Sequence, residues 1–211
     1  MPRRLEGEVW TIVVAGGSGR RFGGPKQFEP LGSCRVVDHS LAAAAVVSAG
    51  VVLVAPPGTH AEGARHVVAG GDTRSASVRS GLAVVPAEAA VVVVHDAARP
   101  LATTNLFERT IAAVRDGADG AVPAVAITDS LRRRGGGPVD RDGLVAVQTP
   151  QAFRAEVLRS AHVSEPDATD DSALVEAAGG TIRLVPGERW NLKITDPEDL
   201  AVAAALLATR S

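Results

Sequence analysis

Short apolar runs that end in glycine, proline or polar residues recur along the chain, and they predict the strands of a buried sheet. The first is Trp10–Ala15, which is followed at once by glycines. Val51–Ala55 is stopped by two prolines and a glycine, and Val91–Val94 is an unbroken valine run. Continuous apolar sequence indicates strands covered on both faces, as in a parallel sheet. Weaker strand signals fall at Arg65–Ala69, Gly120–Ala126 and Thr181–Val185.

Segments of helical length separate these runs. Thr104–Asp116 is one, because its apolar residues recur at helical spacing. The last helix opens with Thr195-Asp196-Pro197-Glu198, a capping-box pattern with proline near the first helical position, and continues to Leu207. The other predicted helices are Val37–Ala49, Ser75–Val85, Ala152–Ala161 and Asp170–Ala178. Strands that alternate with helices predict a three-layer α/β fold with a mostly parallel sheet.

One stretch breaks this alternation. Between Thr128 and Val147, β-type segments flank a run of three arginines and three glycines at 132–137. We interpret residues 129–147 as a short β-arm that projects from the body of the protein. A length of 211 residues suits one domain, so we expect a single domain over residues 1–211 that includes this arm.

Composition narrows the classes of function. The net charge of −2 gives no basic field for nucleic acid, and no apolar run reaches the roughly 18 residues of a membrane span. A single cysteine excludes an internal disulfide and any cysteine-cluster metal site. The N-terminus is basic but lacks the apolar core of a signal peptide. We therefore expect a cytoplasmic protein that binds neither nucleic acid nor membrane.

The choice of cation is uneven. Arginine accounts for 20 of the positive charges and lysine for only 2, Lys26 and Lys193. Such a bias can be purely genomic. A lysine that persists against it is nonetheless a candidate for a role that a compact ammonium fills and a planar guanidinium does not.

A glycine-rich loop follows the first predicted strand. It runs from Ala15 to Gln27 and holds several glycines, two arginines and Lys26. Ligands of open parallel sheets bind beyond the carboxyl ends of strands, and glycines let backbone N–H groups approach phosphate oxygens. The dinucleotide fingerprint fails at Phe22, and the Walker A pattern fails because Lys26 precedes glutamine. We predict a phosphate site of another kind, with a flexible loop of solvated cations as the alternative.

Four further segments place polar residues beyond strand ends or at helix starts. Gly70-Gly71-Asp72 suits a base or ribose, although an ordinary capped turn explains it equally well. Asp96 and Arg99 suit a metal, a hydroxyl or a phosphate, with an ion pair between them as the structural alternative. Thr169-Asp170-Asp171 opens a helix, where it either receives an anion or simply caps the helix. Lys193 precedes the last helix, and a solvated surface lysine is the alternative there.

Taken in order, these segments resemble the 2-C-methyl-D-erythritol 4-phosphate cytidylyltransferase family. The most specific matches are His95-Asp96-Ala97-Ala98-Arg99-Pro100 and Gln148-Thr149-Pro150-Gln151-Ala152-Phe153. The likeness extends from residue 12 to the C-terminus, whereas the loop at 15–27 is shared with other sugar-phosphate cytidylyl- and uridylyltransferases. The further matching motifs are Pro25-Lys26-Gln27, Gly70-Gly71 with Arg74 and Ser77, Thr169-Asp170-Asp171 and Asn191-Leu192-Lys193-Ile194-Thr195.

The resemblance implies a Rossmann-like nucleotidyltransferase fold and transfer of CMP from CTP to 2-C-methyl-D-erythritol 4-phosphate, with release of pyrophosphate, in non-mevalonate isoprenoid biosynthesis. The substrate phosphate attacks the α-phosphorus of CTP in line, which requires positioning and charge neutralisation more than covalent chemistry. The matched catalytic residues are Arg21, Lys26, Arg141 and Lys193. The matched nucleotide contacts are Ala15, Gly16, Gly17, Gly19, Gly71, Asp72 and Ser77, and the matched substrate contacts are Asp96, Arg99, Ser130, Thr149 and Thr169.

The resemblance also implies Mg2+ and a homodimer. The metal is held mainly by the CTP phosphates, with Asp96 as the nearest protein ligand. In the dimer, the arm carries Arg141 to the site of the partner subunit. The chain departs from the family pattern at Ser130, which replaces threonine, at Arg132, which replaces lysine, and at Gly16, which replaces alanine. The arm is also short, with about ten residues between Ser130 and Arg141, and the fused downstream domain of some homologues is not expected.

Two other functions are open on sequence alone. A ribitol 5-phosphate cytidylyltransferase shares the Ala-Gly-Gly start and the Pro-Lys-Gln-Phe and Thr-Pro-Gln motifs, but tends to have valine where Ala98 stands. A nucleotide-binding protein without catalysis is the second alternative. Such a protein is expected to lose the cations that serve only the transition state, yet Arg21, Lys26 and Lys193 are all present.

Overall fold

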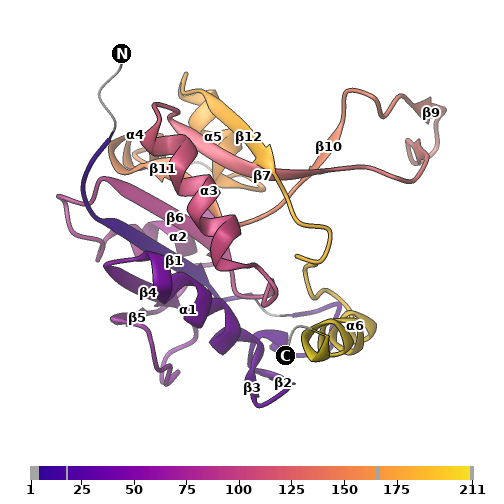
Figure 1. The fold of residues 1–211 in the computed structure, drawn as a ribbon, viewed down its shortest axis with the longest axis horizontal. Helices are drawn as coiled ribbons and strands as arrows, with labels where there is room; N and C mark the ends of the chain where they lie inside the picture. The colour runs from indigo at the N-terminus through magenta and orange to yellow at the C-terminus, as the bar shows by residue number, and fades with distance from the viewer. Residues whose placement is uncertain (1–4, 18, 165–166, 210–211) are drawn as a thin grey trace.

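A mixed β-sheet lies at the centre of the computed structural model, which describes residues 5–17, 19–164 and 167–209 (Figure 1). Its strand order is β10–β7–β11–β6–β1–β4–β5, with β12 paired to β7. β1, β4, β5 and β6 are mutually parallel. β10 and β11 run antiparallel to the strands beside them. The strands are β1 (Val9–Val14), β4 (Gly50–Val54), β5 (His66–Val68), β6 (Val91–Asp96), β7 (Gly120–Ala126), β10 (Val145–Val147), β11 (Gln151–Arg154) and β12 (Ile182–Pro186).

Helices cover both faces of this sheet and complete the predicted three layers. They are α1 (Val36–Val47), α2 (Arg74–Leu82), α3 (Thr104–Arg115), α4 (Ala155–Ala161) and α5 (Asp171–Ala177). Val9 and Val13 of β1 pack with α1 and α3, whereas Trp10 and Ile12 pack on the opposite side with α2, α4 and α5. Because both faces are buried, the strands need apolar residues at every position, which explains the unbroken runs in the sequence.

The last helix, α6 (Pro197–Ala208), stands apart from the sheet (Figure 1). A third apolar cluster joins it to the short hairpin of β2 (Pro30–Leu31) and β3 (Cys34–Arg35), through Leu31, Ile194 and Ala203. This cluster fixes the segment that precedes α6 beside the end of β6. Among the described residues, no helix is long and apolar enough to cross a bilayer.

The structure differs from the sequence prediction at residues 151–161. In place of one helix over 152–161, it has the strand β11 followed by the short helix α4. β11 lies between β6 and β7 and pairs antiparallel with both, so strands remote in sequence satisfy its backbone. Ala152 and Phe153 are buried on opposite faces of the sheet. Pairing of this kind depends on tertiary context, and it overrides the helix preference of an alanine-containing segment.

The predicted arm leaves the sheet after β7 and returns through β10 (Figure 1). Near its tip, β8 (Leu131–Arg132) and β9 (Pro138–Val139) form a two-stranded hairpin. Where the arm returns to the sheet, the apolar side chains of Leu144 and of Val145 and Val147 in β10 are each more than 40% exposed. A single chain therefore leaves this apolar surface of the arm in contact with water.

Candidate active site

A pocket of about 570 Å³ opens at the edge of the sheet where β1, β5 and β6 end. It brings together every residue matched to the nucleotide, and also Asp96 and three of the four matched catalytic residues, Arg21, Lys26 and Lys193. These residues come from four separate regions of the sequence: the glycine-rich loop, the turn before α2 with the start of that helix, the end of β6, and Lys193. The lining consists of residues 14–17, 19–21, 26–27, 71–74, 77, 96–98 and 193, and Ser18 of the same loop lies outside the described residues.

Strand pairing explains why the glycine-rich loop and the acidic residue meet. β1 and β6 are adjacent and parallel, and their register places Val14 opposite Asp96. The chain leaves β1 into the loop at the same level at which β6 ends in the carboxylate. Ligands of open α/β sheets bind at such carboxyl ends.

The shape of the glycine-rich loop depends on Gly19 and Gln27. Gly19 has φ +62°, and a Cβ there would come within 1.7 Å of the carbonyl oxygen of Gly24, so any other residue forces the loop to move. The buried Gln27 side chain donates from Nε2 to the carbonyl oxygens of Ala15, at 2.7 Å, and Gly17, at 3.2 Å. These bonds tie the start of the loop to the short 3-10 helix Lys26–Phe28 and therefore fix the position of Lys26.

A second wall of the pocket comes from the turn before α2. Thr73 caps this helix by accepting a hydrogen bond from the backbone N–H of Ala76 at 3.1 Å. Gly71 donates its N–H to Ser77 Oγ at 3.2 Å, and a Cβ on Gly71 would lie 2.5 Å from that of Ala76. The turn before α2 is therefore an ordinary cap in its bonding, as one alternative expected. Its polar groups nonetheless face the pocket.

Three of the cations that line the pocket, Arg21, Lys26 and Lys193, act on one another through their charges. Burial, followed by the neighbouring charges of Lys193 and Arg21, lowers the pKa of Lys26 below its usual value. All three effects disfavour the ammonium in the free protein. A bound polyanion would offset the repulsion among the cations, since its negative charge would lie between them. The pocket is electrostatically suited to a ligand with several phosphates.

Asp96 is the acidic counterpart of these cations. Its Oδ2 lies 2.6 Å from Lys193 Nζ, and its Oδ1 lies 3.6 Å from Arg74 Nε. Burial alone would raise the pKa of Asp96, but the charges of Lys193 and Arg74 outweigh burial and hold the pKa well below its usual value. Asp96 therefore stays ionised. Arg99, the partner expected from the sequence alternative, instead donates from Nη1 to the carbonyl oxygen of Asn191 at 2.8 Å.

The Gln148-Thr149 pair joins Asp96 to the segment that carries Lys193. Thr149 Oγ1 accepts the backbone N–H of Asp96 at 3.0 Å and lies 3.1 Å from His95 Nδ1. Gln148 Nε2 donates to the carbonyl oxygen of Glu188 at 2.8 Å, and its Oε1 accepts from the N–H of Glu188 at 3.1 Å. One buried dipeptide thus fixes both Asp96 and the segment that carries Lys193.

Five matched residues do not line the pocket of their own chain. Thr149 lies behind Asp96, and Arg99 lies against the segment that leads to Lys193. Thr169 is exposed directly after Asp167 and Ala168, which bond to Thr73 and Ser75 at the start of α2. Ser130 and Arg141 belong to the arm, where Arg141 Nη1 donates to the carbonyl oxygen of Thr128. For these five residues, a contact with substrate remains a prediction.

Arg74 is the main residue of the site to which sequence reasoning assigned no role. It lines the pocket, lies near Asp96, and is anchored from behind by Asp171 Oδ2 at 2.6 Å. Asp171 is fully buried and also contacts His162 Nε2 at 3.0 Å. The Nη2 atom of Arg74 is buried, and within the described part of the chain it has no hydrogen-bond partner. Its place in the Gly-Gly-x-x-Arg-x-x-Ser motif was the available signal.

Histidine 95 makes the stability of this region depend on pH. The side chain is fully buried beside Phe107, and burial lowers its pKa to about 4. As pH falls, this imidazole is protonated near pH 6.5 in the unfolded chain, but only near pH 4 in the folded chain. The free energy of unfolding should therefore rise by roughly 3 kcal/mol as pH increases from about 4 to 6.5.

Urea unfolding, followed by the fluorescence of buried Trp10 across this pH range, measures the effect of His95. The variant His95→Gln retains a polar group but cannot be protonated. We expect it to flatten the pH dependence by a large fraction. An equally steep dependence in His95→Gln would assign the effect to another group.

The donor set fits a divalent cation that is held mostly by its nucleotide. Within residues 5–17, 19–164 and 167–209, no cluster of three or more His, Cys, Asp or Glu side chains is arranged to hold a metal ion. The pocket does offer the carboxylates of Asp96 and Asp72. Mg2+ commonly uses one or two carboxylates together with substrate phosphates and water. The pocket is therefore compatible with a metal that arrives with a triphosphate.

Comparisons with known proteins agree with this geometry. The family model for 2-C-methyl-D-erythritol 4-phosphate cytidylyltransferase matches residues 9–209. A protein of that name from Rubrobacter xylanophilus is 41% identical over 221 residues, which cover 95% of each chain. The bifunctional enzyme IspD/IspF of Granulibacter bethesdensis is 44% identical, and the match covers 92% of this chain but 54% of that protein. The crystal structure of the 2-C-methyl-D-erythritol 4-phosphate cytidylyltransferase from Thermus thermophilus superimposes with a TM-score of 0.82 and 34% identity, covering 93% of this chain and 98% of that one.

Proposed function

Because the chain belongs to the 2-C-methyl-D-erythritol 4-phosphate cytidylyltransferase family, we propose that the pocket between β1 and α2 is where it transfers CMP from CTP to the alcohol phosphate. The products of this reaction are the CDP-linked alcohol and pyrophosphate. The proposal treats the chain as one nucleotidyltransferase domain. It extends the family assignment to named residues of the pocket.

We assign the nucleotide to the two glycine-containing walls. Ala15, Gly16, Gly17 and Gly19 would face the triphosphate, and Gly71, Asp72 and Ser77 would face the cytidine. Backbone N–H groups in such loops bind phosphate oxygens without a side chain in the way. Asp96, Arg99, Ser130, Thr149 and Thr169 are assigned to the alcohol phosphate, the first of them directly from the pocket and the others from its surroundings or from the arm.

Charge neutralisation is the catalytic task assigned to Arg21, Lys26 and Lys193. Negative charge builds up on the oxygens around the α-phosphorus as the new bond forms and pyrophosphate departs. Cations already in place stabilise that charge without reorganising. The single observation that carries this assignment is the convergence of three separate cations on one pocket, close enough to lower the pKa of Lys26.

Mg2+ is the proposed metal, with Asp96 as its protein ligand. When bound, it would reduce the negative charge of the triphosphate. Asp96 is ionised in the free protein, and Lys193 already occupies one of its oxygens at 2.6 Å. If the Asp96 carboxylate holds the metal, the Lys193 ammonium would be available to phosphate.

A homodimer formed through the arm completes the proposal. Arg141 lies on the arm and bonds to Thr128 instead of lining the pocket of its own chain. The arm exposes Leu144, Val145 and Val147, and Leu184 of β12, the strand that pairs with β7, is 53% exposed. A second copy would cover this apolar surface and bring Arg141 to a neighbouring pocket. We also propose the cytoplasmic location that the sequence predicts, since CTP and the alcohol phosphate are both highly charged and do not cross a bilayer unaided.

Removal of the metal gives the first test. With CTP and the methylerythritol phosphate, the purified chain should release pyrophosphate and form the CDP-linked alcohol in equal amounts. Addition of EDTA should reduce the rate by at least about 10²-fold, and excess Mg2+ should restore it. Undiminished product formation in EDTA would contradict the role given to the metal.

A further inference from the structure

Lys193 belongs to a segment without regular secondary structure. The segment runs from Gly187 to Thr195, between β12 and α6. The Lys193 side chain is 42% exposed, and its ammonium lies 2.6 Å from Asp96 Oδ2. An irregular segment does not by itself hold a long side chain in one place. The segment must be fixed by contacts elsewhere if Lys193 is to act on a reacting phosphate.

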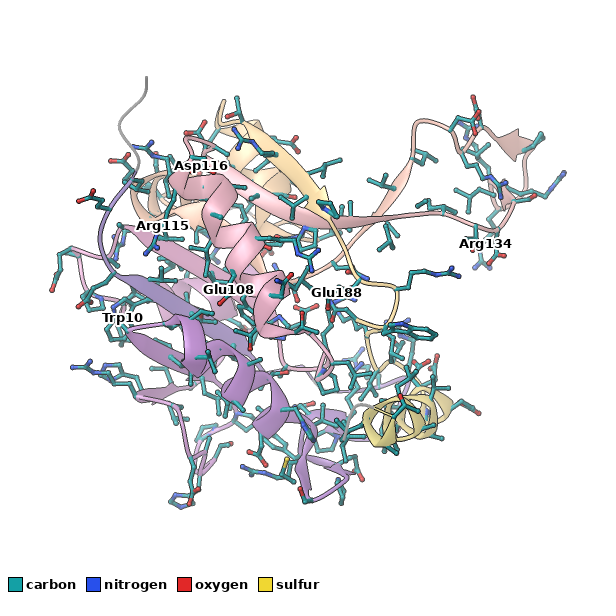
Figure 2. The ribbon with its side chains drawn as sticks, viewed as in Figure 1. Trp10, Glu108, Arg115, Asp116, Arg134 and Glu188 are labelled. Carbon is teal, nitrogen blue, oxygen red and sulfur yellow. The ribbon has the colours of Figure 1, made fainter. Side chains whose placement is uncertain are left out.

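Glu188 anchors the opposite end of this segment to helix α3. Its Oε1 accepts hydrogen bonds from Thr103 Oγ1 at 2.6 Å and from Arg109 Nη2 at 2.7 Å. Its Oε2 lies 3.4 Å from the backbone N–H of Thr103, the residue that caps α3. The carboxylate is 16% exposed, so water screens these bonds only in part. Figure 2 shows Glu188 beside the N-terminal end of α3.

The anchor continues toward Lys193 through buried amides. The backbone N–H and C=O of Glu188 both bond to the Gln148 side chain, at 3.1 and 2.8 Å. Gln148 Oε1 also accepts from Asn191 Nδ2 at 3.3 Å, and the same Nδ2 donates to the carbonyl oxygen of Thr149 at 2.9 Å. Asn191 is fully buried two residues before Lys193. The contacts therefore form a continuous chain from α3 to Asn191, which lies two residues before Lys193.

We propose that Glu188 is a positioning residue for Lys193: its carboxylate fixes the 187–195 segment to the start of α3 and thereby holds the ammonium at the reacting phosphates. This inference rests on the proposed function and deepens it. Gln148 and Asn191 belong to the motifs that carry the family resemblance, whereas Glu188 lies outside those motifs. The ion pair with Arg109 joins the motif residues to a rigid helix.

Steady-state kinetics of Glu188→Ala test the proposal. We expect kcat to fall by about 10-fold while the KM for CTP changes less than about 2-fold, because Lys193 acts mainly in the transition state. Glu188→Gln keeps an acceptor for Thr103 but loses the charge that faces Arg109, so it should recover part of kcat. The matched control is Glu156→Ala, which removes the carboxylate of another Arg–Glu pair, Arg154–Glu156, whose glutamate is 73% exposed. It should leave kcat unchanged.

A double-variant cycle separates positioning from general stabilisation. If Glu188 acts through Lys193, then Glu188→Ala should change kcat by less than about 2-fold in a Lys193→Ala background. The same 10-fold loss in that background, or an unchanged kcat in the single variant, would overturn the proposal. Should Glu188→Ala fail to fold, the same cycle with Glu188→Gln decides the matter. A wild-type chain that forms no product would refute the proposed function itself, which is a distinct outcome.

Discussion

Replacement of Lys26 by alanine should lower kcat by about 10³-fold and leave the KM for CTP within several-fold of its wild-type value. The ammonium is held at the pocket by Gln27 and the short helix that follows Pro25, in a position where burial and two other cations lower its pKa. The charge is unfavourable there until phosphate is present. Its interaction therefore grows from the free protein to the transition state, and its loss falls on kcat.

Two further variants delimit the effect of Lys26. Lys26→Arg keeps the positive charge but replaces a compact, rotatable ammonium with a planar fork, and it should recover only part of the rate. Arg154 lies at the end of β11 remote from the pocket and pairs with the exposed Glu156. Arg154→Ala should therefore leave kcat near wild type. Product formation by Lys26→Ala within about 3-fold of wild type would contradict the role of Lys26.

Mixing two inactive variants should regenerate activity. Lys193→Ala and Arg141→Ala are each expected to lose about 10³-fold in kcat, since each removes a cation assigned to the reacting phosphates. If Arg141 acts in the partner subunit, a dimer with one chain of each kind contains one site with both residues intact and one site without either. Half of the dimers in an equal mixture are of this kind, so activity should return to about a quarter of the wild-type level.

Size-exclusion chromatography with light scattering accompanies the mixing experiment. It should report a dimer for the wild type and for both variants, because neither substitution removes the apolar residues of the arm. A mixture that stays inactive although the chains exchange would place Arg141 outside the partner's site. A monomeric wild-type chain with full activity would remove the arm from the mechanism altogether.

Much of the fold follows from local patterns in the sequence. The valine run of β6 and the apolar run of β1 are buried on both faces, as continuous hydrophobicity predicts, and α3 and α6 lie within a few residues of their predicted limits. β11 does not follow from local sequence, because its partners lie more than 25 residues away along the chain. The same limit hides the β2–β3 hairpin, whose two-residue strands carry too little pattern to detect.

The candidate site likewise contains residues that the sequence identifies and residues that only the tertiary structure identifies. The loop glycines, Lys26, Asp96 and Lys193 stand out in sequence because their residue types and motifs are distinctive, and the structure brings them into one pocket. What sequence does not give is the supporting layer. Glu188 is one acidic residue among many until the fold places it 2.7 Å from Arg109, and Arg74 becomes prominent only between Asp96 and Asp171. Both depend on distances set by tertiary structure.

The choice of alcohol phosphate tests the central claim most directly. The purified chain, with CTP and Mg2+ held constant, is assayed for pyrophosphate release with 2-C-methyl-D-erythritol 4-phosphate and, separately, with ribitol 5-phosphate. We expect kcat/KM to be at least about 10²-fold higher with the methylerythritol phosphate, because a site built for one polyol leaves polar groups unpaired with the other. A higher kcat/KM with ribitol 5-phosphate would contradict the account.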